Sequence, residues 1–188
     1  MPTINHAEDR ARAILWAREV LGNDRSLIVD LETTALKDAE IVQIGAINMD
    51  GSTCLDRLIR PLGEISEGAA AIHGITKNAL KDCPTFAEQT TTITDALDMR
   101  HIVIFNLRFD YEVLYFELAR AIGEFDAREW MGKSASWKCA MLQYSAFVGE
   151  PGKYGGYKWQ RLPGGDHSAL GDCRACMKII HEMATASV

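Results

Sequence analysis

The chain has 188 residues, the size of one ordinary domain, and 47% of them are hydrophobic. Charged residues make up 24%, so the composition is that of a folded protein and excludes a disordered one. The formal net charge of −6 excludes a protein that is basic over its whole surface, but it leaves local basic patches open.

The first part of the chain predicts a helix, a buried strand and a hairpin. Apolar side chains recur at helical spacing over residues 7–21, and Gly22 ends that pattern. The short apolar run at 26–30 is typical of a buried strand. The Asp50–Gly51 pair predicts a tight turn that joins two further strands. We expect those two strands at 41–49 and 53–59.

The rest of the chain alternates helices and strands. Residues 64–97 have the pattern of short helices, which Pro84 interrupts. We expect helices at 86–97, 108–122 and 168–183, strands at 101–105 and 136–140, and a loop at 150–166. Strands that alternate with helices after a hairpin predict an α/β fold with a sheet of mixed direction.

The sequence also indicates the cellular setting. No apolar run is long enough to span a bilayer, and charged residues stand where a signal peptide would be apolar. Five cysteines at irregular spacing favour reduced thiols over a disulfide framework. Cys173 and Cys176 fall within the last helix, so we expect buried thiols there and not a metal or redox site. We expect a cytoplasmic protein that binds no membrane.

Two carboxylates stand at the end of the first buried strand. Asp30 and Glu32 are two residues apart, so in a strand their side chains point to the same face. Their negative charges would repel each other unless a cation lies between them. For an isolated pair, a solvated strand end is an equally good interpretation.

Two further acidic residues fall at comparable places. Asp110 follows the strand at 101–105, at the kind of position where open α/β sheets bind ligands. Asp172 falls in the first turns of the last helix, shortly after His167. Taken singly, each acid also fits the N-terminal turn of a helix, where it would stabilise the helix dipole.

Together, the four carboxylates predict an oxygen-rich site that suits Mg²⁺ or Mn²⁺. Two such ions about 3.5–4 Å apart can hold a phosphate during an in-line displacement. His167 beside them can take a proton from the attacking water, which is the role of a general base.

Three motifs resemble those of the DnaQ-like 3′–5′ exonucleases, in particular the DEDDh group. They are Asp-Leu-Glu-Thr-Thr at 30–34, Asn-x-x-Phe-Asp at 106–110 and His-x-Ala-Leu-x-Asp at 167–172. Ile-His-Gly-Ile-Thr at 72–76, which follows Arg60-Pro61, resembles another signature of the family. The family includes the epsilon proofreading subunit of DNA polymerase III and RNase T. The resemblance covers about residues 26–183.

This resemblance implies an RNase H-like fold: a five-stranded mixed sheet, with antiparallel hairpin strands plus parallel strands, and helices on both faces. It implies an N-terminal helical extension at 1–25 and an exonuclease domain at 26–188, within one globular unit. The catalytic metal ligands that it implies are Asp30, Glu32, Asp110 and Asp172, which would hold two Mg²⁺ or Mn²⁺ ions, with His167 as general base. Ser168 stands where a sister group has Tyr, which favours the DEDDh group.

Substrate contacts follow the family pattern less closely. Ala35, Phe105 and Cys173 stand where the family often has Gly, His and Ala, but none of these changes removes a ligand or the base. The resemblance implies that Thr33 and Leu36 meet the terminal nucleotide. The full set of expected substrate-binding residues is Thr33, Leu36, His73, Asn106, Phe109, Tyr157 and Trp159.

Basic and aromatic residues gather in residues 128–161. This segment has six Lys or Arg against two Glu, with three Trp and three Tyr. Cations interleaved with aromatic rings suit a single nucleic-acid strand, which offers phosphates and bases that stack. Substrate contact is favoured for Tyr157 and Trp159, which lie in the Gly-rich loop before His167. Core packing is the favoured interpretation for Trp130, Trp137, Tyr144 and Phe147.

We therefore expect a metal-dependent 3′–5′ exonuclease that acts on the 3′ ends of single-stranded nucleic acid and releases nucleoside 5′-monophosphates. DNA is favoured over RNA as substrate. A non-catalytic nucleic-acid or protein binding module on the same fold is the alternative, and a phosphatase or nucleotidase for small substrates is a third. A DNA polymerase or repair complex and a homodimer are partners that the sequence leaves open.

Overall fold

The computed structural model describes residues 5–187, in which five strands and seven helices are found. Residues 1–4 of the expected extension and residue 188 of the expected domain lie outside the described residues. The strands are β1 (Ser26–Thr33), β2 (Ile41–Asn48), β3 (Thr53–Leu58), β4 (Arg100–Ile104) and β5 (Ala135–Cys139). The helices are α1 (His6–Leu21), α2 (Glu67–His73), α3 (Phe86–Leu97), α4 (Leu107–Ile122), α5 (Glu124–Lys133), α6 (Ala140–Val148) and α7 (Ala169–Thr185).

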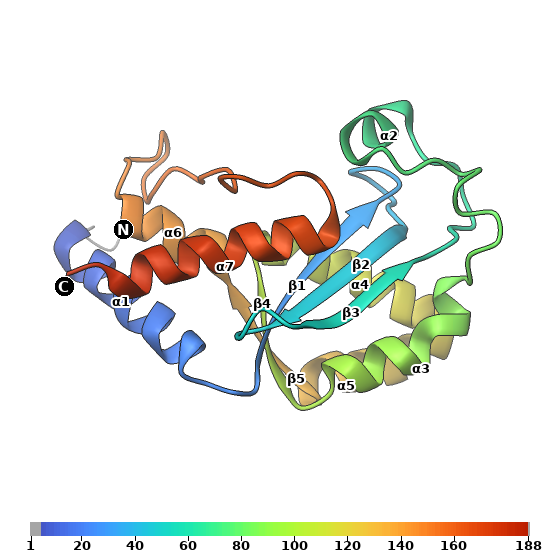
Figure 1. Ribbon diagram of the computed structural model, residues 1–188, viewed down its shortest axis with the longest axis horizontal. Coiled ribbons are helices and arrows are strands. Elements are labelled where there is room, and N and C mark those ends of the chain that lie inside the picture. Colours follow the sequence, from blue (N-terminus) through green and yellow to red (C-terminus); the bar gives the residue numbers. More distant parts are fainter. Residues whose placement is uncertain (1–4, 188) are drawn as a thin grey trace.

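The strands form one mixed sheet in the order β3-β2-β1-β4-β5. β1, β2 and β3 are antiparallel neighbours, whereas β4 runs parallel to β1 and β5 runs parallel to β4. This confirms the expected RNase H-like sheet, in which an antiparallel hairpin extends a set of parallel strands. Because β1, β4 and β5 are parallel, their carboxyl ends meet at the same edge of the sheet (Figure 1).

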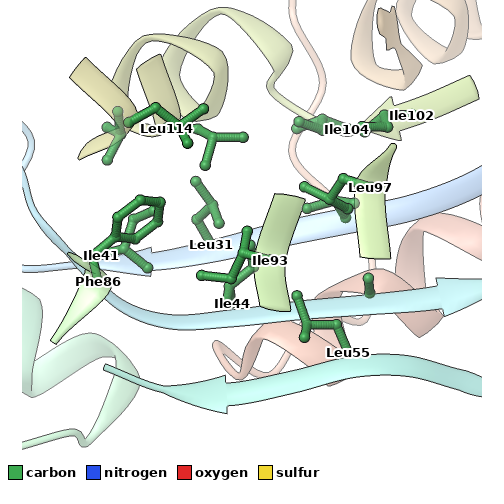
Figure 2. Close-up of a cluster of buried hydrophobic side chains, with 14 of the residues drawn as sticks. Leu31, Ile41, Ile44, Leu55, Phe86, Ile93, Leu97, Ile102, Ile104 and Leu114 are labelled. Atoms are coloured by element: carbon green, nitrogen blue, oxygen red, sulfur yellow. The ribbon is translucent and has the colours of Figure 1, made fainter. Parts of the chain in front are cut away.

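Helices cover both faces of the sheet, and each face has its own hydrophobic core. Along β1, Leu27, Val29 and Leu31 point to one core, and Ile28 points to the other. The first core lies against α3 and α4, and Figure 2 shows Ile93, Leu97 and Leu114 of these helices over the strands. The second core is formed with α1, α6 and α7. The even-numbered side chains of β1, Asp30 and Glu32 included, therefore face the side that carries α7.

Most of the expected elements lie within a few residues of their predicted bounds, but α5 and α6 were not predicted. For residues 123–149 the sequence pattern predicts one strand and no helix, which is wrong. The expectation of core packing there is confirmed, because Trp130, Trp137, Tyr144 and Phe147 are half-buried and pack against the two cores.

Helix α1 is part of the packed structure. Its side chains Ala13, Ala17 and Val20 are buried in the second core, where α1 lies against α6 and α7. Near its end, the Arg18 guanidinium donates hydrogen bonds to the carbonyl oxygens of Ala184 and Ala186, at 2.8 and 2.9 Å. The start and the end of the described chain are thereby held together.

Within residues 5–187, none of the helices combines the length and the apolar character that crossing a membrane requires. The cysteines are free, and Cys173 and Cys176 are buried, as expected.

Candidate active site

Three carboxylates meet at the edge of the sheet where β1 ends. One oxygen each from Asp30, Glu32 and Asp172 can be chosen such that all three lie within 4.8 Å of one another. Asp30 and Glu32 are brought to one face by the alternation of β1. Asp172 reaches them from the first turn of α7, which crosses that face of the sheet.

Local contacts determine where Asp172 lies. The Ser168 side chain caps α7 by accepting a hydrogen bond from the Gly171 N–H at 3.1 Å. The Asp172 Oδ1 accepts hydrogen bonds from the backbone N–H groups of Asp166 and His167, at 2.9 and 3.2 Å. One oxygen of Asp172 therefore holds the entry to the helix.

Asp110 is the fourth carboxylate. It lies in the first turn of α4, directly after the buried strand β4, and it is only 5% exposed. Burial, together with repulsion from Glu32 and opposed in part by a hydrogen bond from its own backbone N–H, raises the pKa of Asp110 to about 8. The Asp110 charge in turn raises the pKa of Asp30. The structure thus brings all four predicted carboxylates into one electrostatic cluster.

The pKa values of the two β1 carboxylates are raised as well. Burial raises the pKa of Asp30 well above its ordinary value, and the charges of Asp110, Asp172 and Glu32 add to this. Burial, followed by repulsion from Asp172 and Asp166, raises the pKa of Glu32 to about 7. Each negative charge in the cluster therefore makes ionisation of the neighbouring carboxyl groups less favourable.

These residues fit a divalent cation. The donors are carboxylate oxygens, which hard cations such as Mg²⁺ and Mn²⁺ prefer. Among the residues that the structure describes, the ion pairs found do not include Asp30, Glu32, Asp110 or Asp172. Charges that are crowded, poorly solvated and without a basic partner call for a cation to balance them.

His167 lies beside the cluster on an exposed segment before α7. Its φ of 58° is in the left-handed region, which is uncommon for a residue other than glycine. The neighbouring residue Asp166 was not among the predicted site residues. Its carboxylate accepts hydrogen bonds from the N–H and the hydroxyl of Ser168, at 3.1 and 2.7 Å. The Asp-x-Ser pattern at 166–168 favours a turn closed by these hydrogen bonds. This pattern is the signal that could have identified Asp166.

His73 belongs to the Ile-His-Gly-Ile-Thr signature at 72–76, and it is one of the residues expected to contact the substrate. Its Nδ1 accepts a hydrogen bond from the Ile75 N–H at 3.0 Å, so Nε2 carries the hydrogen and donates it to the Thr33 carbonyl oxygen at 3.1 Å. Burial, opposed in part by this hydrogen bond, lowers the pKa of His73, and electrostatic interaction with His167 lowers it further. His73 and His167 therefore lie close enough to interact.

A cavity of about 650 Å³ lies between the loop after β1 and helix α4. Leu36, which is 90% exposed, and the half-buried Phe109 both line it. The buried Thr33 lies at the end of β1, and its hydroxyl donates a hydrogen bond to the Ala35 carbonyl oxygen at 3.0 Å. We refer to this space as the Leu36 cavity.

The remaining expected contact residues, apart from His73, lie outside the lining of the Leu36 cavity. Asn106 and Trp159 line a second cavity, at the carboxyl end of β5. The Tyr157 hydroxyl donates a hydrogen bond to Asp9 of α1 at 2.6 Å. Tyr157 is thus joined to α1, and the structure does not bring it together with the carboxylates.

Comparison of the sequence with known proteins identifies relatives. A family model described as exonuclease, RNase T, matches residues 27–180. An uncharacterized exonuclease, CP81 of Escherichia phage 186, is 34% identical over 195 aligned residues, which cover 97% of both chains. The DNA polymerase III epsilon subunit of Buchnera aphidicola is 30% identical over 106 residues. That match covers 50% of this chain and 43% of the epsilon subunit.

Comparison of the fold identifies solved structures with a similar architecture. Exonuclease I of E. coli, solved with a dT13 oligonucleotide, superposes with a TM-score of 0.68 at 19% identity. The match covers 85% of this chain and 41% of exonuclease I, so the chain spans less than half of that protein. At this identity the similarity shows a shared fold.

Proposed function

Since the chain belongs to the DnaQ-like exonuclease family, we propose that it removes nucleotides from the 3′ end of single-stranded DNA and releases nucleoside 5′-monophosphates. The observation that carries this proposal is the carboxylate cluster at the end of β1, in which oxygens of Asp30, Glu32 and Asp172 lie within 4.8 Å of one another. The preference for DNA is supported by relatives that are named as subunits of DNA polymerase III.

We assign Asp30, Glu32, Asp110 and Asp172 as the ligands of two Mg²⁺ or Mn²⁺ ions. Two bound ions would polarise the phosphate and lower the pKa of the attacking water. Two of the four ligands, Glu32 and Asp110, are buried, and Asp110 lies in the first turn of a helix. Rigid elements of this kind hold reacting groups in a fixed geometry.

We assign His167 as the general base. It is exposed beside the cluster, and its own backbone N–H donates to Asp172, so its position depends on the same carboxylate. An imidazole there can accept the proton of the attacking water. Leu36 and Phe109 line the Leu36 cavity and give it an apolar surface, which suits the base of the terminal nucleotide.

The proposal is tested with single-stranded DNA labelled at its 5′ end, together with RNA, duplex and circular DNA of matched sequence. We expect a descending ladder of products from linear single-stranded DNA in Mg²⁺, none in EDTA, and no cut in the circle. Asp30→Ala and Asp172→Ala should abolish the ladder, whereas Asp95→Ala, at an exposed position on α3, should not.

Each contrary result has a distinct meaning. Full activity of both site variants would reject the assigned ligands, and a cut circle would reject an exonuclease. DNA binding without hydrolysis in any divalent ion would favour the non-catalytic binding module. Association with a polymerase or repair complex and formation of a homodimer stay predictions, which co-purification and sedimentation of the full chain would test.

A further inference from the structure

The second cavity, of about 550 Å³, opens at the same edge of the sheet as the carboxylates. It lies between the first turn of α4, the end of β5 and the start of α6, with Trp159 of the following loop at its rim. Its walls are mainly aromatic and aliphatic; we call it the aromatic cavity. The side chains that form these walls are Tyr111, Trp137, Met141, Leu142 and Trp159.

The inner wall of the aromatic cavity is held in place. The rings of Tyr111 and Trp137 meet edge to face, with centroids 5.0 Å apart. The Trp137 indole N–H donates a hydrogen bond to the Met131 carbonyl oxygen at 2.8 Å, which fixes the orientation of the ring. A wall that is already ordered loses little entropy when a flat ligand packs against it.

The outer rim is apolar and open to solvent. Trp159 is 61% exposed and Leu142 is 53% exposed. Large side chains that remain this exposed around a concave apolar surface are typical of a binding site.

One basic side chain lines the cavity as well. Arg108 lines it, is exposed, and makes no ion pair with the residues that the structure describes. One acid, Glu112, also borders the cavity. Aromatic rings beside cations offer both stacking for a base and contact with its phosphate.

Helix α4 relates this cavity to the carboxylate cluster. Phe109 lines the Leu36 cavity and Tyr111 lines the aromatic cavity, and the buried Asp110 stands between them in the sequence. In the proposed function, the terminal base enters the Leu36 cavity and the scissile phosphate lies at the carboxylates. Glu112 borders both cavities, so the aromatic cavity lies next to the Leu36 cavity on α4, within reach of the strand that continues away from the 3′ end.

We propose that the aromatic cavity binds an unstacked base of the DNA strand, upstream of the linkage that is cut. This inference rests on the proposed function, since that function brings the strand to Asp110. The base stacks between Trp159 and the wall formed by Tyr111 and Trp137, while Arg108 contacts a phosphate. Stacking tolerates any base, so the site adds affinity for a single strand without a demand on sequence.

Binding of a fluorescent dT10 oligonucleotide in EDTA tests this inference without hydrolysis. Trp159→Ala and Leu142→Asp should each weaken binding on the order of ten- to a hundredfold, the usual value of a stacked base. Leu15→Asp is the matched control, because Leu15 is an exposed leucine, at 56%, on helix α1 away from both cavities. Its affinity should stay within twofold of the original protein.

An abasic site moved one position at a time from the 3′ end locates the base. The original protein should lose affinity at one internal position, and Trp159→Ala should show no further loss there. Equal affinity of the original protein and both variants, or sensitivity at the 3′-terminal base alone, would overturn the inference and indicate another occupant, such as a protein segment.

Hydrolysis of the same oligonucleotide in Mg²⁺ separates this inference from the proposed function. Should the original protein cut dT10 while both variants bind it equally well, the function stands and the cavity assignment fails. Should the original protein cut no strand but lose affinity at one internal abasic position, the cavity assignment stands and the proposed function fails. A p-nitrophenyl ester of thymidine 5′-monophosphate serves as the reference substrate. When the inference is correct, the ratio of the activity of Trp159→Ala on dT10 to its activity on this ester falls in proportion to its affinity for dT10.

Discussion

Gly45 on β2 lies opposite Asp30 on β1 in the antiparallel pair, and the first turn of α7 rests directly on Gly45. A Cβ at position 45 would lie 2.8 Å from the carbonyl carbon of Ala169 and 2.9 Å from the backbone nitrogen of Leu170. The absence of a side chain therefore lets α7 approach the sheet, so that Asp172 reaches Asp30.

This contact predicts the effect of Gly45→Ala. The added methyl group would meet backbone atoms, so α7 would have to shift, at a cost of about 1–3 kcal/mol in the free energy of unfolding. Because Asp172 moves with α7, we expect kcat on single-stranded DNA to fall about 10- to 100-fold. Urea unfolding and steady-state kinetics measure the two effects.

Gly132→Ala is the matched control for this substitution. Gly132 lies inside α5, and a Cβ there would meet nothing within 4 Å. Alanine is the better helix former, so stability should rise by about 0.5–1 kcal/mol with activity unchanged. A Gly45→Ala protein with normal stability and kcat would show that α7 does not depend on this contact.

Glu117 joins helix α4 to the sheet. Its carboxylate accepts a hydrogen bond from the Ile41 N–H at 3.0 Å, and Arg120 bridges it to Glu40. Glu40 in turn accepts hydrogen bonds from two backbone N–H groups, those of Leu62 and Gly63. Burial raises the pKa of Glu117, and the hydrogen bond from Ile41 opposes part of that rise. The cluster therefore fixes the helix that carries Asp110.

Two substitutions of Glu117 should separate the contribution of its hydrogen bond to stability from the contribution of its charge. Glu117→Leu leaves the buried N–H of Ile41 without an acceptor, so we expect a loss of about 2–4 kcal/mol in the free energy of unfolding. Glu117→Gln retains an acceptor oxygen and should lose only about 1 kcal/mol. Glu112→Gln, on the exposed side of α4, should change stability by less than about 0.5 kcal/mol. Equal unfolding midpoints for the leucine and glutamine variants would contradict this role.

In the metal-free protein, ionisation of Asp110 should lower the free energy of unfolding as pH rises. Its pKa of about 8 lies above the ordinary value of 3.8, so the unfolded chain gives up the proton at lower pH than the folded one. Stability therefore falls as pH rises between about 4 and 8, and levels off above that range. Removal of the charge by Asp110→Asn should relieve this cost.

We expect Asp110→Asn to stabilise the protein in EDTA by about 1–2 kcal/mol at pH 8 and by less at pH 5, while it abolishes nuclease activity. Thermal unfolding at the two pH values measures the difference. Asp95→Asn, on the exposed side of α3, should show no such dependence on pH. A gain that is equal at both pH values would mean that the Asp110 charge is not the cause.

Strands β1 to β4 were predictable because they have clear local patterns, whereas β5 has no apolar run. β1 and β4 are short apolar runs, and the turn at Asp50–Gly51 uses a glycine whose φ is 85°. Helices α5 and α6 were missed for two different reasons. α5 has few apolar residues and an internal Gly132, and α6 is a short apolar run directly after a strand, a pattern that does not distinguish helix from strand.

The candidate site was predictable as far as the order of the sheet determines it. Asp30 and Glu32 lie in the last residues of β1 and Asp110 follows β4, and the carboxyl ends of these parallel neighbours lie at the same edge of the sheet. The approach of α7 to Gly45 was not predictable, because it joins segments more than a hundred residues apart. The bond between Tyr157 and Asp9 joins residues 148 positions apart and leaves no local signal.

His167 should be needed for turnover and not for folding. Its φ of 58° would strain most replacements, but asparagine tolerates the left-handed region, so His167→Asn removes the imidazole with little backbone cost. We expect kcat to fall about 10²- to 10⁴-fold with KM nearly unchanged, the usual effect of losing a general base. Added imidazole should restore part of the rate. His181→Asn, an exposed histidine on α7, should keep the normal rate. Normal turnover in His167→Asn would assign the proton transfer to another group, and His73, whose pKa is lowered in part by its interaction with His167, would be the next to test.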